Sequence, residues 1–408
     1  MSITQLNRLE KNHRPVSTRK KVSPSTTPPL SLFSNFIIDF ENQFFTSQLI
    51  TYIGNKRRLL PFINQGIEKI KSKLGKEKLV TLDGFSGSGA VSRLLKYHAS
   101  ELWVNDFEDY CEVVSKCYLA NRSEVDYDYL SNTINWLNEN KLKSRGGIGF
   151  IEKNYAPAND NNIKQGERVF YTNKNAKIID NLKGLIFKEI SQETRHFFLA
   201  PLIVEASIHT NTSGVFKGFH KKNGKGCFGG QGENALTRIK KEIYLKPPVF
   251  SDVECDVHIR KMDTNLLVKS ADVPAVFDMV YYDPPYNQHP YGSNYFMLNI
   301  IANEAEEIPI QDGVSGIAVD WKRSAYNKYD NAKSAMNELI AATPAKYILI
   351  SYNDEGLIKI NDFKSILNKY GDYELLEKEY NTYRGSRNLN NRNIKVQELL
   401  WILKKKQG

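Results

Sequence analysis

The sequence has few cysteines and no long apolar run, and each absence excludes a class of protein. Its four cysteines, Cys111, Cys117, Cys227 and Cys255, form no CxxC pair and have no histidines nearby at metal-site spacing. We therefore expect a reduced protein without a bound metal. No apolar run reaches the roughly 18 residues of a membrane span, and the first residues lack the apolar core of a signal peptide. These features predict a cytoplasmic protein with no membrane partner.

Acidic residues are the minority, with 46 Asp and Glu against 56 Lys and Arg, and the basic excess is unevenly placed. Residues 1–30 carry six basic side chains and one acidic one, and residues 201–250 carry eight and three. A charged block is often only a solvated surface. Two such blocks are also the electrostatic pattern of a protein that binds nucleic acid phosphates.

A chain of 408 residues is long enough for an α/β domain with an insertion or a second domain. Residues 1–30 hold Ser, Thr, Pro and basic residues with few large apolar side chains, so we expect a disordered basic arm. The aromatic segment that follows, FSNFIIDFENQFF at residues 33–45, is expected to pack onto the core as a strand or short helix.

A glycine-rich turn follows the first apolar strand, in KLVTLDGFSGSGAVSRLLKY at residues 78–97. The strand ends at Asp83, the turn covers residues 84–89, and a helix begins at once, as in the first βα unit of a Rossmann-like fold. Glycine lets a ligand approach the backbone at the helix N-terminus, where the dipole favours an anionic group. The spacing is not GxGxxG, which argues against a nicotinamide or flavin site.

A second strand, ELWVND, ends at Asp106 about twenty residues further on, where Rossmann-like folds hold ribose hydroxyls. A ligand with a ribose and no required pyrophosphate fits S-adenosylmethionine. Further strands are predicted at CDVHIRKMD, ending at Asp263, at AKYILISYND, and at two C-terminal segments, residues 372–380 and 395–403.

The stretch FDMVYYDPPYN, residues 277–287, is the most informative in the chain. A buried strand ends where Pro284 and Pro285 cannot donate to a ladder. Asp283 and the Pro284 carbonyl can accept the two N–H bonds of an exocyclic amino group, and Tyr286 can stack on its ring. Such a geometry requires a base outside the helical stack, and hence base flipping. A plain strand-ending turn is the alternative.

Between residues 123 and 250 the alternation of strands and helices stops, and helical segments lead into a glycine-rich loop. We interpret the segment as a DNA recognition insertion, although a flexible surface loop is the alternative. A long hairpin tip, YRGSRNLNNRN, is either a second DNA contact or a solvated loop. The residues predicted to touch DNA are Lys217, His220, Lys221, Lys222, Lys225, Arg384, Arg387 and Arg392.

The segments YIGNK, DGFSGSG and DPPY, in this order, resemble the N6-adenine-specific DNA methyltransferases of bacterial restriction-modification systems, in their alpha-type arrangement or D12 class. The resemblance implies a Rossmann-like α/β methyltransferase fold, with a mixed seven-stranded sheet, helices on both faces and an inserted, mostly helical target-recognition domain. The predicted catalytic domain comprises residues 31–122 and 251–408, and the insertion residues 123–250.

The resemblance also implies the roles of individual residues. The turn departs from the family in starting with Gly84-Phe85 where Pro-Phe is common. The catalytic residues are expected to be Asp283, Pro284, Pro285 and Tyr286, without a metal. The residues expected to bind S-adenosylmethionine are Tyr52, Lys56, Asp83, Phe85, Gly87, Gly89, Asp106, Asp263 and Asp283.

The activity implied is methyl transfer to the N6 amino group of adenine in a specific double-stranded DNA sequence. It would protect host or phage DNA from a cognate restriction endonuclease, with which no stable complex is required. Three alternatives stay open: an N4-cytosine methyltransferase, which typically carries SPPY; an RNA or protein amide methyltransferase, which more often carries NPPY; and an inactive DNA-binding relative.

Overall fold

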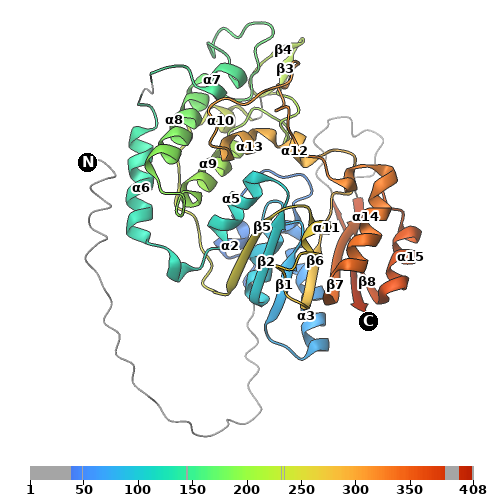
Figure 1. The fold of residues 1–408 in the computed structure, drawn as a ribbon. Coiled ribbons are helices and arrows are strands. Elements are labelled where there is room, and N and C mark those ends of the chain that lie inside the picture. The colour runs from blue at the N-terminus through green and yellow to red at the C-terminus, as the bar shows by residue number, and fades with distance from the viewer. Residues whose placement is uncertain are drawn as a thin grey trace, which may run out of the picture.

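A seven-stranded mixed sheet forms the centre of the molecule, with strand order β5-β2-β1-β6-β7-β9-β8 (Figure 1). The computed structural model describes residues 38–47, 49–143, 146–230, 232–233, 235–381 and 395–406. The strands of the sheet are β1 Leu79–Asp83, β2 Ala99–Asp106, β5 Asp256–Lys261, β6 Phe277–Tyr282, β7 Ala345–Asn353, β8 Gly371–Asn381 and β9 Lys395–Lys405. The predicted seven-stranded α/β fold is confirmed.

Five neighbouring strands, from β5 through β7, run parallel, and β9 runs antiparallel to both β7 and β8. The carboxyl ends of the parallel strands therefore share one edge of the sheet. The strand order reverses between β1 and β6, and open α/β sheets bind ligands at such a switch point.

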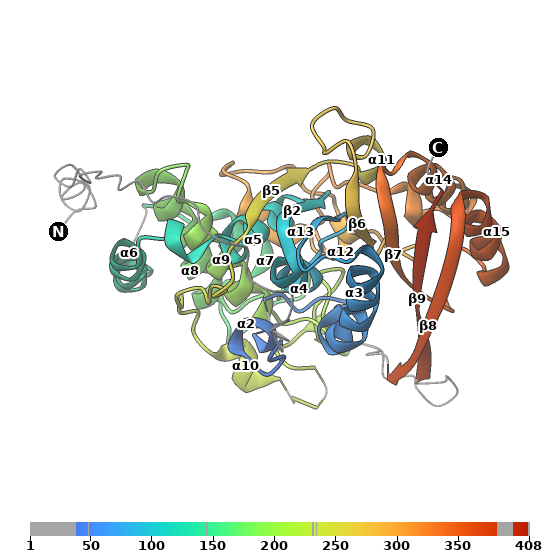
Figure 2. The same cartoon turned by 90° about the horizontal axis from the view of Figure 1, so that it is seen from below.

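Helices cover both faces of the sheet because its central strands are apolar on both sides. In β6, Met279 and Tyr281 belong to the apolar cluster formed with α2, α3 and α4, whereas Val280 and Tyr282 belong to the cluster formed with α11, α14 and α15. Figure 2 shows the sheet between these layers. Their bounds are α2 Gln43–Thr46, α3 Leu60–Leu74, α4 Ala90–His98, α11 Thr264–Leu267, α14 Tyr329–Ala342 and α15 Ile360–Tyr370.

The segment between β2 and β5 is mostly helical and lies to one side of the sheet (Figure 1). Within this segment, helices α6 to α9 belong to the predicted insertion, and they pack against α5 and α13 in one continuous apolar cluster. The insertion therefore shares its core with elements outside it, and its boundaries at residues 123 and 250 remain a prediction. The segment between β2 and β5 comprises α5 Asp109–Tyr118, α6 Tyr127–Asn140, α7 Phe150–Tyr155, α8 Asn173–Glu189, α9 His196–Ile208, β3 Lys221–Lys222, β4 Lys225–Gly226 and α10 Leu236–Lys240. After β6 come α12 Tyr291–Asn294 and α13 Phe296–Ala302.

The described part of the aromatic segment, residues 38–45, packs onto the core as expected. It forms the short helix α2, in which Phe44 and Phe45 are buried and both rings contact Tyr97. The remaining short elements are the 3-10 helices η2 Lys56–Leu59, η3 Arg122–Glu124 and η4 Ala325–Asn327. The predicted basic arm, residues 1–30, lies outside the described residues.

Candidate functional site

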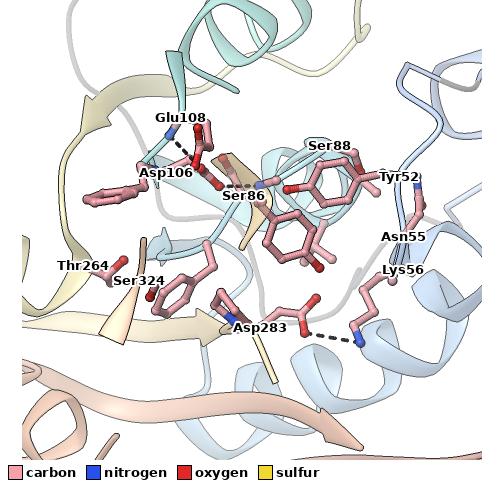
Figure 3. A pocket seen from close by; sticks show the side chains of 18 of the residues that line it. Tyr52, Asn55, Lys56, Ser86, Ser88, Asp106, Glu108, Thr264, Asp283 and Ser324 are labelled. Atoms are coloured by element: carbon pink, nitrogen blue, oxygen red, sulfur yellow. Dashed lines mark hydrogen bonds and ion pairs between the residues drawn. The ribbon is translucent and has the colours of Figure 1, made fainter. Parts of the chain in front are cut away.

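A cavity of about 860 Å³, including the part open to solvent, lies at the carboxyl edge of the parallel strands. Loops after β1, β2, β5 and β6 all contribute to its wall, so segments that are far apart in sequence meet there (Figure 3). Seven of the nine residues predicted to bind cofactor line it: Tyr52, Lys56, Phe85, Gly87, Asp106, Asp263 and Asp283. This volume is in the range of small-molecule sites.

The other two predicted residues, Asp83 and Gly89, lie behind the cavity wall and support the glycine turn. Asp83 accepts hydrogen bonds from Ser92 Oγ at 2.6 Å and from the Phe85 amide at 3.4 Å. Burial raises the pKa of the Asp83 carboxyl to about 7 despite these donors. Gly89 is the N-cap of α4, with a positive φ of 76° that a residue with a side chain rarely adopts.

Asp106 ties the end of β2 to the glycine turn. Its Oδ2 accepts from the Gly87 amide at 2.7 Å, and its Oδ1 accepts from the amides of Phe107 and Glu108 at 2.6 and 3.1 Å. Burial raises the pKa of the Asp106 carboxyl, against the lowering effect of these amides. A Cβ at Gly87 would lie 3.1 Å from the Tyr52 ring, so glycine permits this close approach.

Lys56 joins the first motif to the DPPY motif (Figure 3). Its Nζ lies 2.7 Å from Glu398 Oε1 and 3.3 Å from Asp283 Oδ1. Burial disfavours the charged ammonium, but the carboxylates of Asp283 and Glu398 outweigh it and raise the pKa of Lys56 well above its usual value. The ammonium is thus engaged by carboxylates of the protein itself.

Asp283 stands at the end of β6 with its side chain 18% exposed. Burial raises the pKa of its carboxyl to about 7, with Lys56 lowering it and Glu398 raising it. No residue that the structure describes donates a hydrogen bond to the buried Oδ1 atom of Asp283. Ser86 Oγ, also on the cavity wall, is likewise buried without a partner among the described residues. These two polar atoms fit a site that takes a polar ligand.

Tyr286 lies beside Asp283 but does not line the cavity. Its ring lies 5.8 Å from Lys56 Nζ and 6.4 Å from the Tyr352 ring. Gly54 passes directly against it, because a Cβ there would come within 3.0 Å of Tyr286 Oη. Gly54, in the YIGNK segment, therefore packs against the predicted stacking residue. Of the two prolines, Pro284 is buried and Pro285 lines the cavity.

The residues predicted to contact DNA fall into two groups. Four lysines, Lys217, Lys221, Lys222 and Lys225, are exposed on or next to the β3–β4 hairpin and form no ion pair with any described residue, whereas His220 is partly buried. Arg384, Arg387 and Arg392 lie outside the described residues.

Several residues of the site were not predicted. Glu108 lines the cavity, accepts from Asn299 Nδ2 at 2.6 Å, and has a pKa raised by burial to about 7. Ser324 and Asn327 are the N-cap and last residue of the short 3-10 helix η4, whose segment carries no periodic pattern, and Glu398 comes from β9. The one available signal for Glu398 was an acidic residue within the apolar run VQELLWIL.

The described residues contain no group of three or more His, Cys, Asp or Glu arranged to hold a metal ion. They also contain no helix that is long and apolar enough to cross a membrane.

The chain resembles known proteins over most of its length. A family model described as D12 class N6 adenine-specific DNA methyltransferase matches residues 52–366. Type II methyltransferase M.NlaIII of Neisseria lactamica is 29% identical over 366 residues, which cover 87% of this chain and 99% of that protein. Type II methyltransferase M.CviAII of Paramecium bursaria Chlorella virus 1 is 28% identical, over 82% of this chain and 93% of its own length. Modification methylase LlaI of Lactococcus lactis subsp. lactis is 26% identical over 87% of this chain and 55% of its own length.

Proposed function

The chain belongs to the D12 class of N6 adenine-specific DNA methyltransferases, and we propose that it methylates the N6 amino group of a flipped adenine. As a member of this class it is a DNA methyltransferase that depends on S-adenosylmethionine. The observation that carries the proposal is Asp283, whose side chain lines the cavity and is 18% exposed, while its buried Oδ1 faces Lys56.

The chemistry of the amino group explains what Asp283 does. The lone pair of an exocyclic amine is delocalised into the ring, so the group is a poor nucleophile until both N–H bonds are held by acceptors. Asp283 accepts one N–H and the Pro284 carbonyl accepts the other, which aims the lone pair outward. The negative charge of Asp283 also stabilises the positive charge that develops on N6.

The cofactor supplies an electrophilic methyl group when it is bound. The residues proposed to hold it are the cavity-lining set, with Asp106 at the ribose and the glycine turn at the amino-acid end. Asp83 and Gly89 act behind this set by fixing the turn. We propose that no metal takes part, because the amino group is activated by hydrogen-bond acceptors alone, so EDTA should leave methyl transfer intact.

DNA recognition is assigned to the insertion, residues 123–250. Exposed lysines on the β3–β4 hairpin suit phosphate contacts, since they have no carboxylate partner among the described residues. The partly buried His220 and the arginines Arg384, Arg387 and Arg392 are proposed to assist. Because a duplex base cannot reach Asp283 within its stack, the adenine must flip, and Tyr286 stacks on it.

The biological role follows from the relatives, whose names describe type II methyltransferases and modification methylases. We propose that this protein modifies the recognition sequence of a cognate restriction endonuclease, with which it needs no stable complex. It would act in the cytoplasm, where the DNA to be protected lies.

The decisive experiment is methyl transfer from radiolabelled S-adenosylmethionine to double-stranded DNA, followed by digestion to nucleosides. Label in N6-methyl-2′-deoxyadenosine, with and without EDTA, supports the proposal. Label in N4-methyl-2′-deoxycytidine, or incorporation only into RNA or protein, would replace it by one of the other methyltransferase classes. Fluorescence of 2-aminopurine at the target position reports flipping separately, since the analogue brightens when it leaves the stack.

A further inference from the structure

Glu398 is a fully buried carboxylate in the middle of an otherwise apolar stretch of β9. Its Oε1 accepts hydrogen bonds from Lys56 Nζ at 2.7 Å and from Ser351 Oγ at 2.6 Å. Its Oε2 is buried and has no hydrogen-bond partner among the described residues. Burying an ion is costly, and an apolar residue of similar size is often at least as stable at such a position. A role beyond stability would explain why a charge stands there.

The position of Lys56 between its two carboxylates is asymmetric. The ammonium makes a hydrogen bond with Glu398, whereas its 3.3 Å contact with Asp283 is an ion pair without hydrogen-bond geometry. Asp283 Oδ1 is itself buried against Lys56, so the other carboxylate oxygen is the one left to accept from the base amino group. Held by Glu398, Lys56 favours the ionised Asp283 and fixes its carboxylate in this orientation.

We propose that Glu398 is a positioning residue for methyl transfer, which acts by holding the Lys56 ammonium against the buried Asp283 Oδ1, so that the other carboxylate oxygen is oriented toward the cavity. The inference rests on the proposed function, because it takes Asp283 as the acceptor of the adenine amino group. Glu398 itself is not proposed to touch substrate or cofactor. Ser351 supports it from β7 by fixing the same carboxylate oxygen.

The charged and titratable groups around Asp283 give the expected sign of a pH effect. Lys56 lowers the pKa of its carboxyl and Glu398 raises it, while Asp283 in turn raises the pKa of Tyr281, Tyr286, Tyr291 and Asp83. Activity that needs the ionised carboxylate is lost as the pH falls through this pKa. Removing the charge of Glu398 should therefore move the acid limb to lower pH, and removing the charge of Lys56 should move it to higher pH.

The test is the single-turnover rate of N6-adenine methylation by the full chain, measured across pH with saturating cofactor and DNA. Glu398→Gln keeps the size of the side chain and removes its charge. At saturating cofactor we expect a rate about tenfold to a hundredfold lower, as for a displaced positioning group, with an acid limb at lower pH. Ser351→Ala, which keeps both charges, should lower the rate in the same direction by less. It provides the same test if Glu398→Gln does not fold.

A double-mutant cycle tests whether Glu398 acts through Lys56. Lys56→Met leaves two buried carboxylates without a cation, so its acid limb should rise, and adding Glu398→Gln should bring the limb back down. A Glu398→Gln enzyme that melts at lower temperature but keeps the wild-type rate and pH profile would make Glu398 merely structural. A wild-type chain that makes no N6-methyladenine would remove the proposed function as well, so the two failures are distinguishable.

Discussion

Lys56 and the lysines of the β3–β4 hairpin differ in what fixes their positions. Lys56 is 4% exposed and is held by Asp283, directly after β6, and by Glu398, on β9. Lys222 and Lys225, on the β3–β4 hairpin, are exposed and form no ion pair with the described residues. The protein itself positions the buried cation, whereas a binding partner must position the exposed ones.

The difference has a measurable consequence, because salt screens exposed charges far more than buried ones. Substitutions around Lys56 should change rates in a way that does not depend on salt. Substitutions on the hairpin should change DNA affinity in a way that does. The predictions below test this contrast, from the largest expected effect to the smallest.

Asp283→Ala should lower the single-turnover rate by about a hundredfold or more, since it removes a preorganised acceptor at the reacting group. The loss should be the same at low and high salt. Asp278→Asn is a matched control, because Asp278 lies at the other end of β6 and pairs with Lys76 and Lys346. It should lower the melting temperature and leave the rate intact. Near-normal methylation by Asp283→Ala would contradict the mechanism.

Asp106→Ala should weaken S-adenosylmethionine binding by about 1.5 to 3 kcal/mol, the usual value of a hydrogen bond to a charged group. It also frees the Gly87 amide, so the glycine turn loses its tie to β2. Titration calorimetry measures the effect. Asp109→Ala, three residues further on and paired with Lys261, is the control and should keep the wild-type affinity. Equal affinities for both variants would refute the assignment of Asp106.

Tyr286→Ala should remove base stacking worth about 1 to 3 kcal/mol. Tyr286→Phe should keep much of the activity, because the face of the ring, and not its hydroxyl, stacks on the base. Rates of methyl transfer and 2-aminopurine fluorescence measure the two steps separately. If the phenylalanine variant were as inactive as the alanine variant, the hydroxyl and its neighbour Gly54 would be the functional contact instead.

The parts of this site that could be predicted from sequence are those that follow parallel strands. Asp106 ends β2, Asp263 lies two residues after β5 and Asp283 directly follows β6, and the carboxyl ends of parallel strands share an edge, so their meeting follows from the fold class. The central strands were found because buried strands are recognisable as short apolar runs, whereas β5 and β8 are only partly buried.

Glu398 could not be predicted in the same way. It lies 342 residues from Lys56 and on an antiparallel strand, so neither local spacing nor the strand-end rule indicates their contact. Ser324 and Asn327 were missed because they belong to the single turn of η4, too short for a periodic pattern, where side-chain direction depends on the final packing. Charge composition located the hairpin lysines but could not distinguish a binding surface from a solvated one.

Whether the hairpin lysines bind DNA or are only solvated can be tested by replacing one lysine at a time, and the expected effect is small. If Lys221, Lys222 or Lys225 contacts a phosphate, its replacement by Ala should lower the slope of log affinity against log salt by about 0.9, and affinity near 0.15 M salt by about fivefold. The effects should add, because each lost contact releases its own counterion. Lys364→Ala, on exposed α15 away from the hairpin, is the control and should leave the slope unchanged (Figure 1). If the hairpin variants matched that control, the lysines would be plain solvated surface, and the contrast with Lys56 would lose its functional meaning.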